Sequence, residues 1–260
     1  MNRTRPKQIL IRVSEEELEQ IKKKVKESGK NQQQYIIEAL TQKQIINTDG
    51  IKEIYPELIE TIRDEKKICH YLDLPIQHCN DDILKRMGRK TTQADLREKI
   101  SMLRKEIPDI ALRTTLISGF PGETNENHEE CVDFVANMKF ERLGVFPYSP
   151  EEGTPAAEYD RQLPDEIKQE WADEIMQTEQ NVIFAQNEEM IGRKLSVIVD
   201  GYLPEDGVYV GRTYRDAPEI DGCLFFEAPY EIISGTILPV LVTDANGYDL
   251  IGEILPEEDD

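Results

Sequence analysis

Three features are scarce in this 260-residue sequence: long apolar runs, closely spaced cysteines and positive charge outside the N-terminal region. No stretch approaches the roughly 20 apolar residues that are needed to cross a bilayer. The basic N-terminus, MNRTRPKQ, also lacks the apolar core of a signal peptide. We therefore expect a cytoplasmic protein with no membrane contact. With 38% hydrophobic residues, the chain can still bury the cores of two or three domains.

The four cysteines, Cys69, Cys79, Cys131 and Cys223, are scattered along the chain. No pair has the two-residue spacing of a zinc knuckle or a redox motif. In a reducing compartment such thiols are typically small buried side chains that fill space. The sequence therefore predicts no metal site.

The formal net charge of −21 is unevenly distributed. Residues 1–45 contain ten Lys and Arg against six Asp and Glu, whereas the remaining residues contain 21 against 46. The N-terminal end can therefore approach nucleic acid, and the rest of the chain should repel it.

The N-terminal segment, residues 1–46, has the pattern of one strand and two helices. Apolar and polar residues alternate over 7–13, which is typical of a half-buried strand. Ser14 and Glu17 have capping-box spacing at the start of a helix that ends at Gly29, and a second helix begins near Asn31. A unit of this size cannot bury its own core, so we expect a homodimer.

Two stretches, RVSEEELEQI and SGKNQQQYIIEAL, resemble the ribbon-helix-helix segment of MobC-like plasmid mobilisation proteins. The resemblance implies a two-stranded ribbon in the major groove of duplex DNA. It places Arg5, Lys7, Gln8 and Arg12 at the DNA. The alternative is a small dimerisation module whose polar face is solvated.

Residues 58–160, which follow a junction at 47–57, alternate between strands and helices, the order expected for parallel βα units. The strands are HYLDLPIQH, RTTLIS and RLGVFPYS. One helix, DDILKRMG, ends at Gly88; another begins at Thr92 with Asp95 at the capping-box position, and a third begins at Thr124 and directs Val132, Val135 and Met138 inward. Three such strands form at most half of a barrel.

The C-terminal third has a different pattern. Residues 161–189 predict a connecting helix with Pro164 near its start. Residues 190–256 contain short strands separated by Gly, Pro and Asp, which favours a small antiparallel barrel, and residues 257–260 form an acidic tail.

The stretch RTTLISGFPGET ends its strand in a turn rich in glycine. Glycine permits positive φ and close approach of another molecule, so we expect exposed main-chain groups beside Gly119. Such groups can pair with the edge of a purine. The alternative is an ordinary turn between a strand and a helix.

Four stretches together, LDLPIQHCNDDILKRMGRK, RTTLISGFPGET, RLGVFPYSPEEGTPA and GRTYRDAPEIDG, resemble the C-terminal part of the RimO-type radical SAM methylthiotransferases. This family modifies an aspartate of a small-subunit ribosomal protein. The resemblance runs from about Leu58 to the C-terminus and implies half of a radical SAM barrel followed by a TRAM-like β-barrel. It implies contacts with S-adenosylmethionine from Gln77, His78, Ile117, Gly119 and Glu123. Two alternatives remain open, that His78 is a core histidine and that Glu123 is a helix N-terminal acid.

The same resemblance implies a 4Fe-4S cluster held by three thiolates in a CxxxCxxC motif. That spacing does not occur in the sequence, so we expect the cluster ligands to be absent and the chain to be inactive by itself. No catalytic residue can be assigned. We also expect the first three barrel strands to be missing, as in a fusion or a truncated relic.

The predicted partner is the basic ribosomal protein, bound through the acidic TRAM-like domain. From Met190 to the end there are four Lys and Arg against 15 Asp and Glu, which opposes an RNA backbone. Acidity that only maintains solubility is the alternative. Two other functions are considered: a DNA-binding dimer of the mobilisation type that carries an inert fragment, and an acidic module that captures a ribosomal protein without modifying it.

Overall fold

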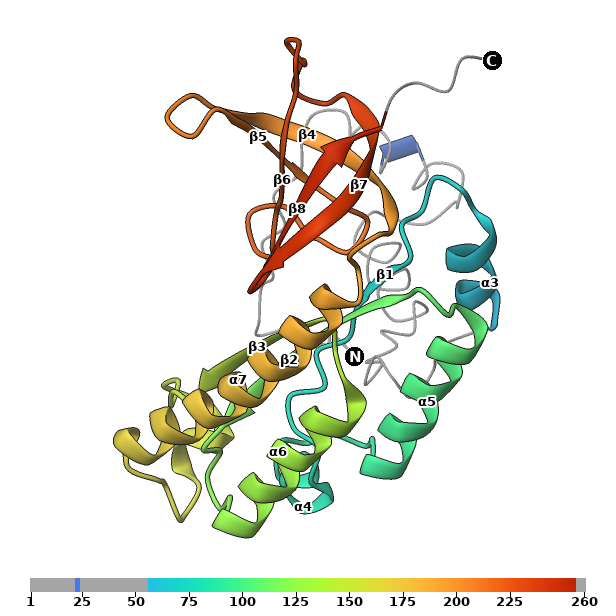
Figure 1. Cartoon of the computed structure of the whole chain (residues 1–260). Coiled ribbons are helices and arrows are strands. Elements are labelled where there is room, and N and C mark those ends of the chain that lie inside the picture. The colour runs from blue at the N-terminus through green and yellow to red at the C-terminus, as the bar shows by residue number, and fades with distance from the viewer. Residues whose placement is uncertain (1–21, 24–55, 256–260) are drawn as a thin grey trace. The chain divides into compact units, whose positions relative to one another are not determined.

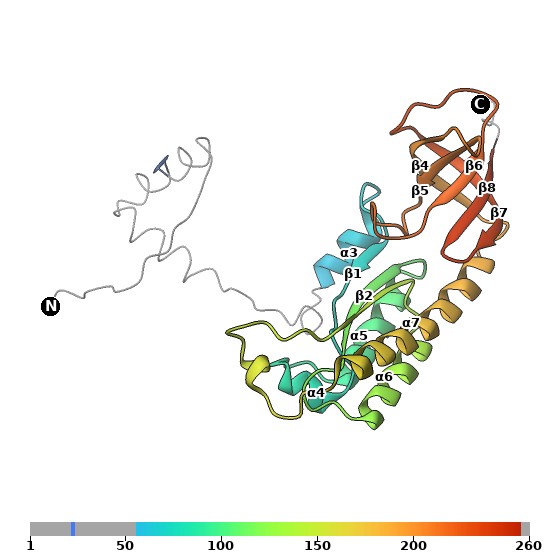
Figure 2. The same ribbon diagram turned by 90° about the vertical axis from the view of Figure 1, so that its left-hand side faces the viewer.

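The computed structural model describes residues 22–23 and 56–255 (Figures 1 and 2). The chain divides into two compact units, residues 1–47 and 48–260, and each is described by itself. In the first unit only Lys22 and Lys23 are described, and both are helical. This agrees with the helix predicted from Ser14 to Gly29. The predicted strand, the second helix and the four predicted DNA contacts lie outside the described residues.

The second unit begins with a three-stranded parallel sheet whose strand order is β1-β2-β3. Its strands are β1 (Tyr71–Asp73), β2 (Ala111–Ser118) and β3 (Arg142–Pro147). The helices are α3 (Pro56–Asp64), α4 (Asp81–Arg86), α5 (Gln93–Glu106) and α6 (Asn125–Met138). The predicted parallel βα units are confirmed.

The first strand is shorter than the predicted strand over residues 70–78. It pairs with β2 at Tyr71–Asp73, and Gln77 adds an isolated bridge to Leu116. Pro75 lies between them, and it has no N–H to donate to the neighbouring strand. The chain therefore leaves the sheet briefly and returns at Gln77.

Local sequence signals explain the helix starts. Thr92 accepts a hydrogen bond from the Asp95 backbone N–H while Asp95 accepts one from the Thr92 N–H, which confirms the predicted capping box of α5. Thr124 and Asn127 form the equivalent arrangement at α6. The buried face of α6 was only partly predicted, because Val135 is buried as expected but Val132 and Met138 are only half-buried.

One face of the sheet carries the core. Along β2 the residues Leu112, Thr114 and Leu116 are fully buried, whereas those between them are half-buried. The buried face packs against apolar residues of α5, α6 and the long helix α7 (Asp165–Glu188). In Figures 1 and 2, α7 lies along the sheet and ends beside the C-terminal barrel.

The C-terminal strands close into a five-stranded barrel in the order β4-β5-β6-β8-β7. They are β4 (Lys194–Leu203), β5 (Val208–Arg212), β6 (Leu224–Glu227), β7 (Ile237–Asn246) and β8 (Asp249–Ile254). The predicted small barrel is confirmed, with a correction: β6 and β8 pair in parallel, so the barrel is not wholly antiparallel. A short 3-10 helix (Pro155–Glu158) lies in the segment before α7.

Ionic and hydrogen-bonding contacts join the barrel to the sheet. The Arg142 guanidinium donates to the Asp216 carboxylate, and both side chains are buried. The Tyr71 hydroxyl donates to Asp221 at 2.9 Å, and Arg113 lies 3.7 Å from the same carboxylate. The loop between β5 and β6 is therefore anchored on the sheet by two aspartates.

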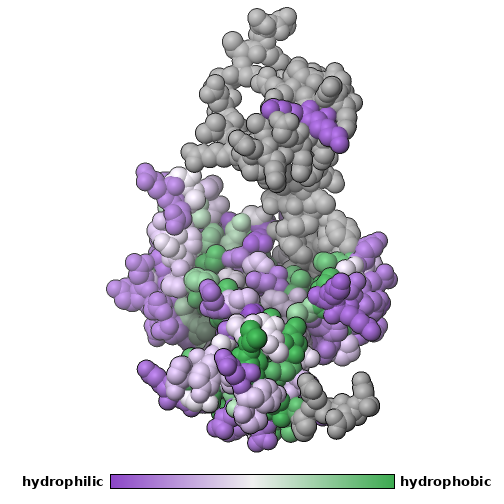
Figure 3. Space-filling model, turned by 90° about the horizontal axis from the view of Figure 1, so that it is seen from above, coloured by the Kyte–Doolittle hydropathy of each residue, from purple (hydrophilic) through white to green (hydrophobic). Residues whose placement is uncertain are grey.

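Across the described residues, no helix is both long and apolar enough to pass through a membrane. The face in Figure 3 is mostly hydrophilic but is interrupted by hydrophobic patches. The exposed large hydrophobic residues of the barrel segment, counted over the described part of the chain, are Ile191, Tyr202, Leu203, Ile220, Tyr230, Ile233, Ile237 and Ile251.

Candidate cofactor site

The structure brings the five predicted cofactor residues together at the C-terminal ends of β1 and β2. Gln77 donates its backbone N–H to the Thr115 carbonyl at 2.9 Å and accepts from the Ile117 N–H at 2.8 Å. Its φ of 69° is unusual for a residue other than glycine. Such strained positions occur often at functional sites, where surrounding contacts maintain them.

The hydrogen-bond pattern determines where the Ile117 carbonyl points. Arg113 and Thr115 accept from Leu74 and Gln77, and Ile117 donates to Gln77, so these alternate residues of β2 direct their backbone groups toward β1. The Ile117 carbonyl faces the same side, beyond the point where Gln77 ends the pairing. This acceptor therefore lies at the edge of the sheet, past the last hydrogen bond that the described residues form between Gln77 and β2.

The N–H groups of the glycine-rich turn are already in use. Glu123 accepts from the Gly119 N–H at 2.8 Å and from the Phe120 N–H at 2.9 Å, through the same carboxylate oxygen. The carboxylate is fully buried and lies one residue before the N-cap of α6, where the helix dipole favours negative charge. Glu123 therefore shapes the turn from inside.

The expectation of bare main chain at Gly119 is not met, because another side chain covers it. Gly119 has φ +75°, and a Cβ at this position would lie 2.3 Å from Cγ of Lys168 in α7. The Lys168 ammonium reaches Asp165 at 2.8 Å and lies 5.5 Å from the centre of the Tyr148 ring. The glycine is thus explained by close packing against α7.

His78 supports the turn from the other side. Its Nδ1 accepts from the Asn80 N–H at 3.0 Å, so a neutral ring carries its proton on Nε2. Nε2 lies 3.2 Å from the second carboxylate oxygen of Glu123, and both side chains are almost fully buried. The two atoms are close, but their geometry is not that of a hydrogen bond, so neither is satisfied by hydrogen bonding within the described residues. His78 therefore combines a core position with a contact to the acid that shapes the turn.

Two cysteines approach each other beneath this turn, an arrangement that the sequence spacing did not predict. The ligand atoms of His78, Cys79 and Cys131 lie within 4.8 Å of one another, and all three residues are buried. A hydrogen bond with the Cys79 thiol and burial both raise the pKa of Cys131. The neutral thiol is therefore the favoured form, and the His78 tautomer leaves neither ring nitrogen free as a ligand. We assign the cluster to packing.

Tyr148 was missed by the sequence reasoning. It follows β3, its N–H donates to the Ser118 carbonyl at 2.8 Å, and its ring packs edge-on against Phe120 with centroids 5.1 Å apart. Burial raises the pKa of Tyr148, and its hydroxyl is a buried polar group with no hydrogen-bond partner in the part of the chain that the structure describes. A buried hydroxyl without a partner is costly, so this atom offers an unused hydrogen-bonding group at the end of β3.

The fold and the site define an α/β protein that ends in a TRAM barrel. Residues 191–255 match the family model described as TRAM domain. A second family model, described as mobilization protein NikA, matches residues 3–70. That match extends past the predicted boundary at residue 46 and includes α3, although Ile59 and Ile62 of this helix are buried in the core of the sheet.

Similar proteins indicate the family of the α/β part. Several of them carry the name ribosomal protein uS12 methylthiotransferase RimO. The relative from Lachnoclostridium phytofermentans is 55% identical over 77% of this chain, and that from Geobacter sulfurreducens is 48% identical over 80%. The relative from Carboxydothermus hydrogenoformans is 44% identical over 78%. Each match covers 46% of the relative, so the chain spans about half the length of the curated relatives it matches. The predicted composite, RimO-type sequence preceded by a mobilisation-like segment, is confirmed.

Proposed function

We propose that residues 58–255 act as the C-terminal half of a radical SAM methylthiotransferase whose substrate is ribosomal protein uS12. The observation that carries this proposal is the 55% identity to a RimO protein over 77% of the chain. The clustering of Gln77, His78 and Ile117 at one sheet edge supports it. In parallel α/β folds, ligands bind outside the carboxyl ends of the strands.

In this proposal the described residues bind and orient S-adenosylmethionine. The Ile117 carbonyl and the Tyr148 hydroxyl offer hydrogen-bonding atoms at the ends of β2 and β3, and the strained backbone of Gln77 lies beside Ile117 on the β1 side. His78 and Glu123 act indirectly, since their contacts hold the turn from Gly119 to Phe120 in shape. When bound, the cofactor would supply the radical chemistry of the family.

A 4Fe-4S cluster does not fit the cysteines of this chain. Such clusters are held by thiolates, conventionally three in this family. Cys69 is exposed whereas Cys79 and Cys131 are buried, and the raised pKa of Cys131 opposes the thiolate form. We therefore propose that the chain alone does not catalyse the reaction and that another polypeptide supplies the cluster.

Anaerobic incubation of the full chain with iron and sulfide tests this point. We expect a colourless protein after desalting, because three converging thiolates are lacking. A brown protein with a stoichiometric iron-sulfur cluster, detected by its visible absorption, would overturn the proposal that this chain cannot hold the cluster by itself. The Cys79→Ser variant would then show whether the buried pair provides ligands.

Calorimetry tests the cofactor surface directly. S-adenosylmethionine or its demethylated product would be titrated into the full chain mixed with the separately expressed N-terminal half of the Lachnoclostridium relative. We expect Tyr148→Phe to weaken binding about tenfold, since leaving a ligand atom without its hydrogen-bond partner costs about 1–3 kcal/mol. Tyr159→Phe is the matched control, because Tyr159 already donates to the Arg86 carbonyl at 3.3 Å. Absence of heat in all mixtures would contradict the proposal.

The proposed macromolecular partner is uS12, bound by the acidic TRAM barrel. Residues 190–255 contain four Lys and Arg against 11 Asp and Glu. A pull-down of purified uS12 with the full chain tests this partner. Binding of uS12 in the absence of any cluster would favour the alternative function, in which the chain captures a ribosomal protein without modifying it. Retention of uS12 by an unrelated protein of equal charge would count against a specific partner.

A second candidate function rests on residues 3–70, which match the mobilization protein NikA model. In this reading a homodimer binds duplex DNA through Arg5, Lys7, Gln8 and Arg12. We expect binding that weakens steeply with salt and drops when Arg12 is replaced by alanine. Duplex binding that is unchanged by added salt and by the Arg12→Ala substitution would argue against this function.

A further inference from the structure

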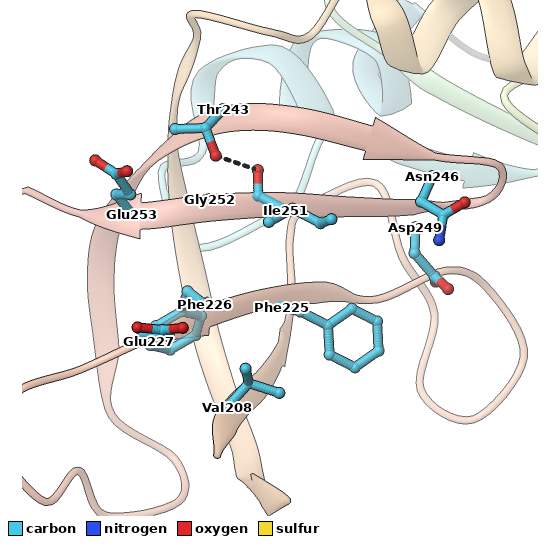
Figure 4. Close-up of a pocket in the computed structure, with 10 residues that line it drawn as sticks. All are labelled: Val208, Phe225, Phe226, Glu227, Thr243, Asn246, Asp249, Ile251, Gly252 and Glu253. Atoms are coloured by element: carbon cyan, nitrogen blue, oxygen red, sulfur yellow. Dashed lines mark hydrogen bonds between the residues drawn. The ribbon is translucent and has the colours of Figure 1, made fainter. Parts of the chain in front are cut away.

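A groove of about 410 Å³ lies on the outer surface of the barrel, where β6 and β8 run side by side (Figure 4). Its walls come from the outward-facing residues of these strands together with parts of β5 and β7. The lining residues that matter here are Val208, Phe225, Glu227, Ile251 and Glu253. None of them is involved in the cofactor site.

Strand alternation explains why apolar side chains face outward here. Leu224 and Phe226 point into the barrel and are buried, so Phe225 between them must lie on the outer face. On β8, Leu250 is buried and Ile251 is 38% exposed. The floor of the groove is therefore apolar although it faces water.

At the acidic end of the groove, the strand register places two glutamates opposite each other. Glu227 and Glu253 are direct partners in the parallel β6–β8 pair, and both side chains are exposed. Like charges opposite each other on neighbouring strands are destabilising. Neither carboxylate makes an ion pair or hydrogen bond within residues 22–23 and 56–255, so no internal contact offsets the repulsion.

Figure 4 shows how the groups are arranged along the groove. Glu227 and Glu253 lie at one end, Asn246 and Asp249 lie at the other, and Phe225 lies between them. An aliphatic stem fits the apolar floor, whereas a cation fits the paired carboxylates. A phosphate or a carboxylate would be repelled by the same pair.

We propose that this groove binds a lysine or arginine side chain of an extended basic polypeptide. The stem lies on Phe225 and Ile251, and the cation lies between Glu227 and Glu253. The inference rests on the proposed function, because it assigns to the TRAM barrel a point of contact with the basic ribosomal protein. Charge complementarity selects this occupant, since the barrel segment as a whole is acidic.

The test uses the full chain and a fluorescent hexapeptide in which arginine and valine alternate. A second peptide carries citrulline, a neutral isostere, in place of each arginine. We expect the arginine peptide to bind and the citrulline peptide to bind at least tenfold more weakly in fluorescence anisotropy. Equal binding of the two peptides would overturn the proposal.

Substitutions locate the binding. The double variant Glu227→Gln, Glu253→Gln should lose at least tenfold in affinity for the arginine peptide, and its isosteric changes on an exposed face leave the barrel folded. The control Glu166→Gln, Glu170→Gln makes the same change of charge on exposed positions of α7 and should bind as the unaltered chain does. An equal loss in both double variants would mean nonspecific attraction and would refute the groove.

Purified uS12 separates this inference from the proposed function. If uS12 binds the unaltered chain and the Glu227→Gln, Glu253→Gln variant equally, the groove is refuted and the substrate proposal stands. If the arginine peptide behaves as expected but uS12 does not bind, the groove stands and the substrate proposal fails. Single-stranded RNA that competes for the groove would overturn the assignment of a cationic side chain.

Discussion

Replacing Gly119 by alanine separates two explanations for this glycine, packing against α7 and access for a nucleoside. The added Cβ would lie 2.3 Å from Lys168 Cγ and 2.8 Å from its Cβ, and the residue would keep φ near +75°. The left-handed conformation costs an alanine about 1–2 kcal/mol, and overpacking adds about 1–3 kcal/mol. We therefore expect Gly119→Ala to lower the free energy of unfolding by about 2–5 kcal/mol.

Gly88→Ala is the matched control for this prediction. Gly88 has φ +77°, but no atom lies within 4 Å of the Cβ that would be added, so only the conformational cost applies. The difference in free energy of unfolding between the two variants, measured by urea denaturation, isolates the packing cost. In thermal denaturation, the melting temperature of Gly119→Ala should be lower than that of Gly88→Ala by about 2–4 °C for each kcal/mol of this difference. Adding Lys168→Ala should recover part of the stability of Gly119→Ala. If Gly119→Ala is no less stable than Gly88→Ala, the packing explanation is wrong.

Three further predictions concern stability. Burial raises the pKa of Glu179 from 4.5 to about 7, so its contribution to stability is fully present below pH 4.5 and is lost as the pH rises through 7. Urea denaturation should therefore give a lower free energy of unfolding at pH 8 than at pH 5. The Glu179→Gln variant should reduce this difference by about 1–3 kcal/mol. Thr92→Ala removes one half of the capping box of α5 and should cost about 1 kcal/mol by thermal denaturation, whereas Thr92→Ser should cost little. Glu253→Gln removes the repulsion with Glu227 and should raise the free energy of unfolding by about 0.2–1 kcal/mol; a loss of stability would contradict the account of the groove.

Much of the fold could be predicted because its signals are local. The capping box of Thr92 and Asp95, the apolar alternation of β2 and the closely spaced barrel strands each depend on residues near one another in sequence. The parallel pairing of β6 with β8 could not be predicted in this way. The choice of partner strand depends on the closure of the whole barrel, which no local pattern records.

The site was predicted less completely for a related reason. Gln77, His78, Ile117, Gly119 and Glu123 do meet, but the neighbour of Gly119 comes from α7, about 50 positions further along the chain. One signal was available: Lys168 precedes Trp171, Ala172 and Ile175 on the buried stripe of α7, at helical spacing. A lysine on an apolar stripe predicts a buried stem, yet it does not reveal which backbone the stem covers.

The loop RDAPEIDG shows how acids of a sequence motif can serve the fold. Asp216 is paired with Arg142 and Asp221 with Tyr71 and Arg113, so these two acids of the loop serve the junction between the barrel and the sheet, whereas its third acid, Glu219, is exposed. Removing one member of a buried pair leaves an uncompensated charge and costs about 3–5 kcal/mol, which is reason enough for an acid at each position. Charges with internal partners are poorly placed to select an external one. Under the proposed function, selection of a basic partner falls to exposed acids that have no internal partner in the described residues, and Glu227 and Glu253 are two such acids that lie opposite each other on a face open to solvent.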